Sequence, residues 1–307
     1  MLVLVGLVLL ALGGEFLVRG TVGVARKLGI SPLLAGLTIV GFGTSAPELV
    51  TGLQAVFRGA NDIAIGNVVG SNIANILLIL GVSALIIGIP ITRKVFRRDG
   101  IAMGVAALAT LGAVLSGGVS QVMGFALIAG LIAYIVIAYR SERSSKVPRE
   151  ESDEGVTDNM ALLALFTIGG MAAIVFGADF LVEGAVAAAT ALGVSEAVIG
   201  LTIVAFGTSL PELVACVAAA MKKQPDIALG NVIGSCIYNI FGILGITAAV
   251  QPLAAPPQIA QFDIWVLVGT TGLLLLFLRT GWTIKRWEGG ILLAAYAAYI
   301  GYLATSA

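Results

Sequence analysis

The chain contains one long segment twice, and this internal repeat limits the possible folds more than any other feature. Shifting the 307-residue sequence by 164 positions superposes its halves without a gap over residues 15–81. Residues 36–50 and 200–214 are identical at 13 of 15 positions, and residues 62–81 and 226–245 at 14 of 20. Such agreement marks two structurally equivalent units. The fold must therefore consist of two related halves.

The composition places both halves in a membrane. Apolar residues make up 59% of the chain, charged residues only 11%, and the mean hydropathy is +1.06. A soluble domain has about 45–50% apolar and about 25% charged residues. The 17 basic and 17 acidic side chains balance, which argues against a nucleic-acid-binding protein. The chain has no histidine, so the usual zinc, haem and catalytic-triad chemistry is excluded and any metal ion must be bound by oxygen.

Apolar segments long enough to cross a bilayer, which requires about 20 residues, recur ten times. They cover residues 2–25, 31–57, 62–90, 100–117, 120–139, 160–190, 195–220, 226–251, 260–278 and 288–305. The sequence therefore predicts an all-α membrane protein with ten transmembrane helices. We expect an N-terminal repeat over residues 1–139, a cytoplasmic linker over 140–159 and a C-terminal repeat over 160–307.

The number of spans and the basic residues together predict an orientation. Five spans per half is an odd number, so the halves would enter the membrane in opposite directions, as in inverted-repeat transporters. Of the 17 Lys and Arg residues, 15 fall in alternate loops on one side, which the positive-inside rule makes cytoplasmic. Both termini are then outside. Residues 2–25 match a span of the second half, so we expect them to be structural rather than a cleaved signal.

Two acidic residues, Glu48 and Glu212, stand within apolar spans at equivalent positions of the repeat. A charge at the bilayer centre costs about 2.5–3.5 kcal/mol, so each carboxylate needs a cation, a proton or a hydrogen-bonding helix. A buried, protonated glutamate that bonds a neighbouring helix is one interpretation, and a cation site is the other.

The residues before each glutamate favour a cation site. Pro47 and Pro211 have no N–H, so the carbonyls of Gly43 and Gly207 lose their helical partners. Irregular backbone within a membrane is tolerated only where it is buried in protein or lines a cavity. We expect the second and seventh helices to be broken there. The third and eighth helices, which carry Gly, Ser and Asn in their middles, are expected to be broken as well.

Hydroxyl and amide side chains recur four residues apart in the third and eighth spans and therefore share a helix face. The members of this face are Asn67, Ser71, Asn75, Asn231, Ser235 and Asn239. For Asn67 and Asn231, hydrogen bonding between helices fits as well as ion binding. Glu15 and Arg19, four residues apart in the first span, are expected to pair. Their counterparts Asp179 and Glu183 have no basic residue nearby in sequence.

The available oxygens suit a large, hard cation. Two carboxylates offer up to four oxygens, and hydroxyls, amides and freed carbonyls offer several more. Ca²⁺ takes 6–8 oxygen ligands in flexible geometry, whereas Mg²⁺ prefers a strict octahedron and keeps its waters. Na⁺ can use the same hydroxyls and carbonyls. Two ionised glutamates can be neutralised by one Ca²⁺ or by two or three Na⁺, but the site cannot comfortably hold both loads at once. Such mutually exclusive occupancy is the physical basis of exchange.

These motifs resemble the paired alpha repeats of the cation/calcium antiporter superfamily, and most closely its sodium/calcium exchanger branch in a prokaryotic, short-loop form. The resemblance rests on GTSAPE at 43–48 with GNVVGSNIAN at 66–75, and on GTSLPE at 207–212 with GNVIGSCIYN at 230–239. It implies ten helices in two inverted halves, ion sites near the membrane midplane, and first and sixth helices that slide against the rest. The cargo would be Ca²⁺ and Na⁺, without a cofactor or a protein partner.

By motif position, the resemblance implies that Ca²⁺ binds to Glu48, Glu212 and the backbone carbonyls of Thr44 and Thr208. It implies Na⁺ and central sites at a second set of residues, namely Ser45, Ser71, Ser209, Ser235, Asn75, Asn239 and the carbonyls of Gly41 and Ala205. The two central positions of the implied site are both asparagine, Asn75 and Asn239. This resembles the potassium-independent exchangers, so K⁺ co-transport is not expected.

The main hypothesis is an electrogenic antiporter that exchanges Na⁺ for Ca²⁺ by alternating access. The resemblance implies three Na⁺ for each Ca²⁺. One alternative is a proton/Ca²⁺ antiporter on the same fold, which would use the same two glutamates. A passive cation channel or a non-transporting scaffold is another. An enzyme has no support, because the sequence contains no nucleophile–base pair or cofactor motif. No nucleic-acid partner is implied.

Overall fold

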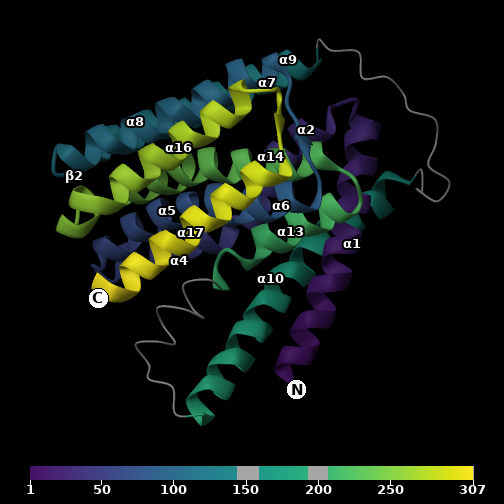
Figure 1. Cartoon of the computed structure of the whole chain (residues 1–307), viewed down its shortest axis with the longest axis horizontal. Helices are drawn as coiled ribbons and strands as arrows, with labels where there is room; N and C mark the ends of the chain where they lie inside the picture. Colours follow the sequence, from purple (N-terminus) through teal and green to yellow (C-terminus); the bar gives the residue numbers. More distant parts are fainter. Residues whose placement is uncertain (144–158, 193–206, 307) are drawn as a thin grey trace.

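The computed structural model describes residues 1–143, 159–192 and 207–306 and is almost entirely helical (Figure 1). In the labels, η marks a π-helical turn. The first half contains α1 (Leu2–Leu28), α2 (Pro32–Ala35), η1 (Gly36–Val40), α3 (Gly41–Thr44), α4 (Ala46–Phe57), α5 (Asn61–Ala74), η2 (Asn75–Ile79), α6 (Leu80–Ile86), α7 (Arg93–Val95), η3 (Phe96–Gly100), α8 (Ile101–Leu115) and α9 (Gln121–Arg143). The second half contains α10 (Met160–Ala191), α13 (Leu210–Met221), α14 (Pro225–Ile237), η5 (Tyr238–Leu244), α15 (Gly245–Val250), η6 (Ile259–Asp263), α16 (Ile264–Arg279) and α17 (Arg286–Ser306).

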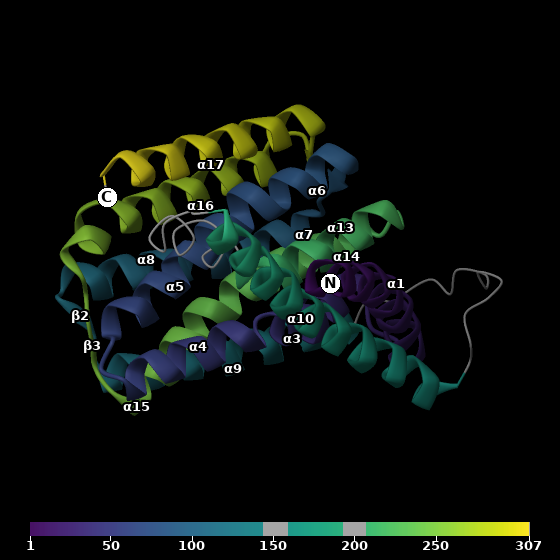
Figure 2. The same ribbon diagram turned by 90° about the horizontal axis from the view of Figure 1, so that it is seen from below.

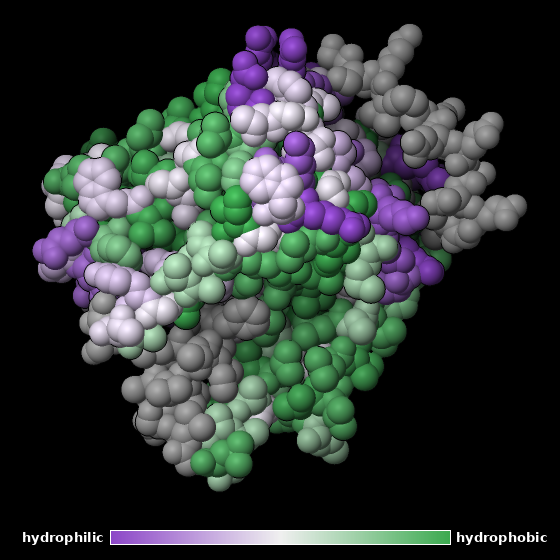
Figure 3. Space-filling view, in the orientation of Figure 1, coloured by the Kyte–Doolittle hydropathy of each residue, from purple (hydrophilic) through white to green (hydrophobic). Residues whose placement is uncertain are grey.

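The helices define a multi-pass membrane protein. Within the described residues, seven helices are long and apolar enough to cross a membrane, and an eighth span results if the bent pair Pro32–Thr44 and Ala46–Phe57 counts as one. Of the other two predicted spans, 195–220 lies partly outside the described residues and contributes α13, and 288–305 forms α17. A broad apolar surface, with hydrophilic side chains gathered mainly along its upper and right edges, is visible in Figure 3.

The third and eighth predicted spans are continuous helices, so the expectation that they are broken is wrong. Asn61–Ile86 and Pro225–Val250 each run through without a break. Each instead contains a π-helical turn, η2 or η5. Neither segment has a proline in its interior, so the backbone hydrogen bonds are not interrupted. They change locally from the α-helical spacing of four residues to the π-helical spacing of five. The second span is bent, as predicted, by 42° between α3 and α4.

These two continuous helices form the centre of the protein. The apolar window of Pro225–Val250 is 83% buried and that of Asn61–Ile86 is 72% buried, against 44% or less for the other five long apolar helices. Glycines allow close approach, because a Cβ on Gly234 of α14 would lie 2.3 Å from the carbonyl oxygen of Leu37. The hydroxyl and amide face predicted from the sequence is therefore placed inside the protein.

Two short β-bridges connect the halves. β1 (Ile89–Pro90) pairs with β4 (Thr283–Ile284), and β2 (Gly118–Val119) pairs with β3 (Leu253–Ala254). β3 lies 164 positions after β1, and β4 lies 165 positions after β2. Each bridge is thus the counterpart of the other under the sequence repeat. The pairing joins one half to the other rather than closing within a half.

The helices α1 and α10 lie side by side in both views of the ribbon (Figure 1 and Figure 2). Their contact is lined by glycines that bring the backbones together. A Cβ on Gly6 would lie 2.7 Å from the Gly177 carbonyl oxygen, and one on Gly13 would lie 2.8 Å from that of Gly170. The two helices therefore pack as a closely fitted pair.

Adjacent glycines in α10 provide a test of this packing. A Cβ on Gly170 would lie 2.4 Å from the backbone nitrogen of Leu17, whereas one on Gly169 would meet nothing within 4 Å. Gly170→Ala is therefore expected to destabilise the protein by about 1–3 kcal/mol, and Gly169→Ala to leave stability unchanged or slightly raised. Thermal unfolding of the two variants in detergent measures the difference. Equal melting temperatures would contradict the packing.

Candidate cation site

In each half, a serine with non-helical backbone angles lies two residues before a proline. Ser45 separates α3 from α4 with φ −86° and ψ 8°, and Ser209 precedes α13 with φ −91° and ψ 2°. Pro47 and Pro211 then lie in the first turn of the helix that follows. Proline fits there because the first backbone N–H groups of a helix have no partner within it. The GTS-x-PE sequence thus separates α3 from α4 in the first half and starts α13 in the second.

This arrangement places the two acidic side chains in the first turns of α4 and α13. Glu48 and Glu212 are each only 1% exposed. The hydrogen bond from Ser45, three residues before Glu48, to the Glu212 carboxylate brings both acidic residues into one region. The N-terminal end of a helix carries partial positive charge, which favours a carboxylate. Two negative groups from the two halves are nevertheless buried together, and a bound cation would relieve their repulsion.

Hydrogen bonds between the halves connect the site. Ser45 Oγ donates to Glu212 Oε1 over 2.7 Å, and Ser235 Oγ donates to the Gly41 carbonyl oxygen over 3.2 Å. Thr44 Oγ1 donates to Asn231 Oδ1 over 3.1 Å. Predicted site residues of one half therefore contact those of the other. A change of position of either half would alter the site directly.

Asn67 and Asn231 hold the glutamate backbone. Asn67 Nδ2 donates to the Glu48 carbonyl oxygen over 3.4 Å, and Asn231 Nδ2 donates to that of Glu212 over 3.3 Å. Of the two roles that the sequence left open for these asparagines, the structure shows hydrogen bonding between helices. The two contacts are equivalent under the repeat and fix α5 to α4 and α14 to α13.

Buried polar atoms without a hydrogen-bond partner are concentrated at the predicted site. Within the described residues there are eight such side-chain atoms, and six of them belong to four predicted site residues. The six are Glu48 Oε2, Glu212 Oε2 and both amide atoms of Asn75 and Asn239. Buried polar groups are nearly always bonded, because leaving one unpaired costs free energy. Unpaired buried oxygens are what a dehydrated cation requires.

Three further predicted site residues are buried or half-buried. Ser71 is 6% exposed and Ser209 4%, while Thr208 is half-buried. Ala205 lies outside the described residues, so its predicted carbonyl ligand cannot be placed. Within the part of the chain that the structure describes, no group of three His, Cys, Asp or Glu side chains could hold a metal ion. The predicted set therefore consists of two carboxylates and neutral oxygens.

Contacts from α10 complete the region, and the motifs gave no sign of them. A Cβ on Gly43 would clash with the Met171 side chain, and one on Gly207 would lie 2.5 Å from Val182 Cγ2. Apolar side chains of α10 thus cover the glycines that precede both helix breaks. The repeat of Gly-Thr-Ser in each half is the sequence signal that could have indicated close packing there.

The π-helical turns coincide with the central asparagines. η2 begins at Asn75, and Asn239 is the second residue of η5. π-helical turns often mark functional sites. The amide side chains at these positions are turned into the protein interior, at 1% and 0% exposure.

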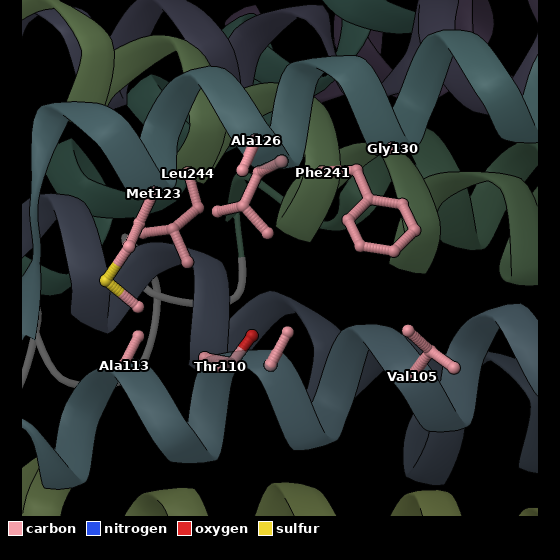
Figure 4. Close-up of a pocket in the computed structure, with 10 residues that line it drawn as sticks. Val105, Thr110, Ala113, Met123, Ala126, Gly130, Phe241 and Leu244 are labelled. Carbon is pink, nitrogen blue, oxygen red and sulfur yellow. The ribbon is translucent and has the colours of Figure 1, made fainter.

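A cavity of about 310 Å³ lies elsewhere, between α8, α9 and η5 (Figure 4). Its lining includes Val105, Met123, Phe241 and Leu244, with the Thr110 hydroxyl among apolar groups. It contains none of the predicted site residues. This apolar space is unsuited to a bare cation.

The bond between Ser45 and Glu212 gives a testable prediction. Ser45→Ala leaves Glu212 Oε1 without this donor, and a hydrogen bond to a charged group contributes about 1.5–3 kcal/mol. We expect the apparent Ca²⁺ affinity in uptake assays to fall about tenfold or more. Ser83→Ala is the matched control, because Ser83 is also fully buried but donates to the Ile79 carbonyl oxygen within its own helix. Equal affinities in the two variants would contradict a role for Ser45.

The fold and the buried oxygens define a multi-pass membrane protein with a candidate cation site between two halves. The profile of the sodium/calcium exchanger protein family matches residues 1–140 and 162–305. The sodium/calcium exchanger MaX1 of Methanosarcina acetivorans is 35% identical over 98% of this chain and 97% of its own length. The putative antiporter CaxA of Alkalimonas amylolytica is 36% identical over 97% and 96%.

Solved structures agree with these relatives. The sodium–calcium exchanger NCX_Mj, soaked with Na⁺ and Sr²⁺, superposes with a TM-score of 0.86 and 34% identity over 98% of this chain and 97% of that one. The chain therefore belongs to the sodium/calcium exchanger family. This places it among membrane transporters rather than enzymes.

Proposed function

We propose that the protein exchanges Na⁺ for Ca²⁺ across its membrane by alternating access, and that the exchange is electrogenic. Family membership and the resemblance to NCX_Mj support Ca²⁺/cation antiport. The observation that carries the proposal is the pair of unpartnered buried carboxylate oxygens, Glu48 Oε2 and Glu212 Oε2, one from each half. A site shared by two halves is one that a relative movement of the halves can open to either side.

In this proposal Ca²⁺ is bound by Glu48, Glu212 and the carbonyls of Thr44 and Thr208. Na⁺ occupies flanking and central positions at a second set of residues, namely Ser45, Ser71, Ser209, Ser235, Asn75, Asn239 and the carbonyls of Gly41 and Ala205. The burial of the described side chains and the bonds that link Ser45 and Ser235 to the other half support this assignment.

Charge then explains the coupling. Two ionised glutamates provide two negative charges, which one Ca²⁺ balances in full. Three Na⁺ in their place leave the loaded site with one more positive charge than Ca²⁺ does. The two loads depend on the same two negative charges, so one ion species leaves when the other binds. Exchange of three Na⁺ for one Ca²⁺ would move one net charge in each cycle.

The proposed architecture has ten helices in two inverted halves, residues 1–139 and 160–307, joined by a linker over 140–159. The equivalent β-bridges and the equivalent Asn–Glu contacts support two related halves. The concentration of basic residues supports a cytoplasmic linker and outside termini. Most of that linker lies outside the described residues.

The proposal is tested by Ca²⁺ uptake into proteoliposomes loaded with Na⁺. Uptake is expected to rise when Na⁺ is present only inside, and to stop when choline replaces Na⁺. Vesicles without protein, and vesicles with equal Na⁺ on both sides, are the controls. Uptake that ignores the Na⁺ gradient but follows an imposed pH gradient would favour the alternative, a proton/Ca²⁺ antiporter that uses the same two glutamates.

A further inference from the structure

An ion-pair cluster joins α1 of the first half to the end of α13 in the second half. Glu15 Oε1 lies 2.5 Å from Arg19 Nε, which confirms the predicted pair. Glu15 Oε2 lies 2.7 Å from Lys222 Nζ, a contact between distant parts of the sequence. Lys222 directly follows α13, the helix whose first turn carries Glu212. The cluster therefore connects α1 to an element of the candidate cation site.

The repeat supplies a second pair of the same charges. The shift of 164 positions relates Glu15 to Asp179 in α10, and Lys222 to Arg58 at the end of α4. Asp179 and Arg58 are both exposed. Neither has an ion-pair partner among the residues that the structure describes. One pair is formed, and its repeat counterpart is open.

The packing of the helices has the same asymmetry. α1 and α10 both contact α13, whereas neither makes a comparable contact with α4, the counterpart of α13. A Cβ on Gly14 of α1 would lie 2.9 Å from Ala218 Cβ of α13, so the two helices are in close contact. The α1–α10 pair is thus placed against one half of the candidate site and away from the equivalent helix of the other.

Alternating access gives this asymmetry a meaning. In a transporter built from inverted repeats, the access states differ largely by a movement of one half against the other around a fixed site. Because the two halves are equivalent in sequence, a contact that one half makes in the first state has a counterpart that can form in the second. We propose that Glu15–Lys222 and Asp179–Arg58 are alternating ion pairs, of which one forms in each access state while the other opens. The proposal rests on the alternating access of the proposed function.

The strength and placement of the groups fit this role. A carboxylate on a membrane-spanning helix is costly without a partner, and Asp179 forms no ion pair with the residues that the structure describes. Partly exposed ion pairs shift an equilibrium by up to about fivefold. A pair of that strength favours one state without trapping it.

Cysteine cross-linking tests the proposal in the full-length protein in proteoliposomes. Glu15→Cys with Lys222→Cys, and Arg58→Cys with Asp179→Cys, are made in a background where Cys216 and Cys236 are replaced. A short bifunctional thiol reagent then reports the proximity of each pair. Both pairs are expected to cross-link in transport-active protein, although only the first forms an ion pair among the residues that the structure describes.

Charge removal then tests the reciprocity. Lys222→Gln is expected to raise the yield of the 58–179 cross-link by up to about fivefold, and Arg58→Gln to raise that of the 15–222 cross-link. Lys223→Gln is the matched control, because the neighbouring Lys223 is exposed and forms no ion pair among the described residues. No 58–179 cross-link in active protein, or a yield that Lys222→Gln leaves unchanged, would overturn the proposal.

The charge-exchanged protein, Glu15→Lys with Lys222→Glu, covers the case in which cysteine variants fold poorly. It should transport better than Lys222→Glu alone, and equal transport would count against the pair. Cross-linking reports positions and needs no Na⁺ gradient. If removal of one pair raises the cross-linking of the other but Ca²⁺ uptake does not depend on Na⁺, the alternating ion pairs are supported and the proposed function is refuted. If uptake depends on Na⁺ but the cross-linking yields do not change, the ion pairs are refuted and the proposed function is supported.

Discussion

Replacement of Glu48 by glutamine is expected to abolish Ca²⁺ transport while the protein still folds. Glutamine keeps the shape of the side chain but removes one of the two acidic groups of the buried site. At an effective dielectric constant of about 20, the attraction between one carboxylate and a unit positive charge about 4 Å away contributes about 4 kcal/mol to ion binding. Loss of even that amount weakens ion binding by about 1,000-fold. Glu212→Gln should have the same effect, because the two positions are equivalent in the repeat.

The matched control for these variants is Asp62→Asn. Asp62 is exposed in the first turn of α5. Its replacement also removes one acidic charge at the start of a helix, but this charge lies outside the buried site. Transport should remain near the level of the unchanged protein. Size-exclusion chromatography and thermal unfolding establish that all three variants fold. Retained Ca²⁺ transport in both Glu48→Gln and Glu212→Gln would refute the assigned site.

Membrane voltage should shift the Ca²⁺ distribution that the transporter sustains. One net charge that crosses the membrane in each cycle couples to the potential by about 2.3 kcal/mol per 100 mV. At about 1.4 kcal/mol for each factor of ten, this equals about a 50-fold change in the Ca²⁺ ratio. Ca²⁺ accumulation in Na⁺-loaded proteoliposomes, with the potential set by K⁺ and valinomycin, measures the change. An unchanged ratio would mean electroneutral exchange, with two Na⁺ for each Ca²⁺.

The sequence was sufficient for much of this structure because its strongest signals are local. Apolar length identified the long helices, and Pro47 with the preceding glycines identified the bend between α3 and α4, since proline removes a backbone donor wherever it stands. The expected break in the third and eighth helices was wrong. Gly, Ser and Asn weaken a helix, but only the packed interior decides whether the ladder ends or widens into a π-helical turn.

Contacts between the halves could not be read from the sequence. The spacing of Glu15 and Arg19 predicted their pair, but Lys222 lies more than 200 positions away and reaches Glu15 only through the packing of α1 against α13. The bond from Ser45 to Glu212 is of the same kind. The repeat indicates which positions are equivalent, and the fold decides which of two equivalent contacts is formed.

The most direct test of the central claim is whether Na⁺ and Ca²⁺ exclude each other from one site. Ca²⁺ binding to the purified protein can be measured by isothermal calorimetry at several Na⁺ concentrations, with choline to keep the ionic strength constant. The apparent Kd for Ca²⁺ should rise more steeply than in proportion to Na⁺, because more than one Na⁺ displaces each Ca²⁺, and Glu212→Gln should abolish binding. A Ca²⁺ Kd that is independent of Na⁺ would contradict exchange at a shared site.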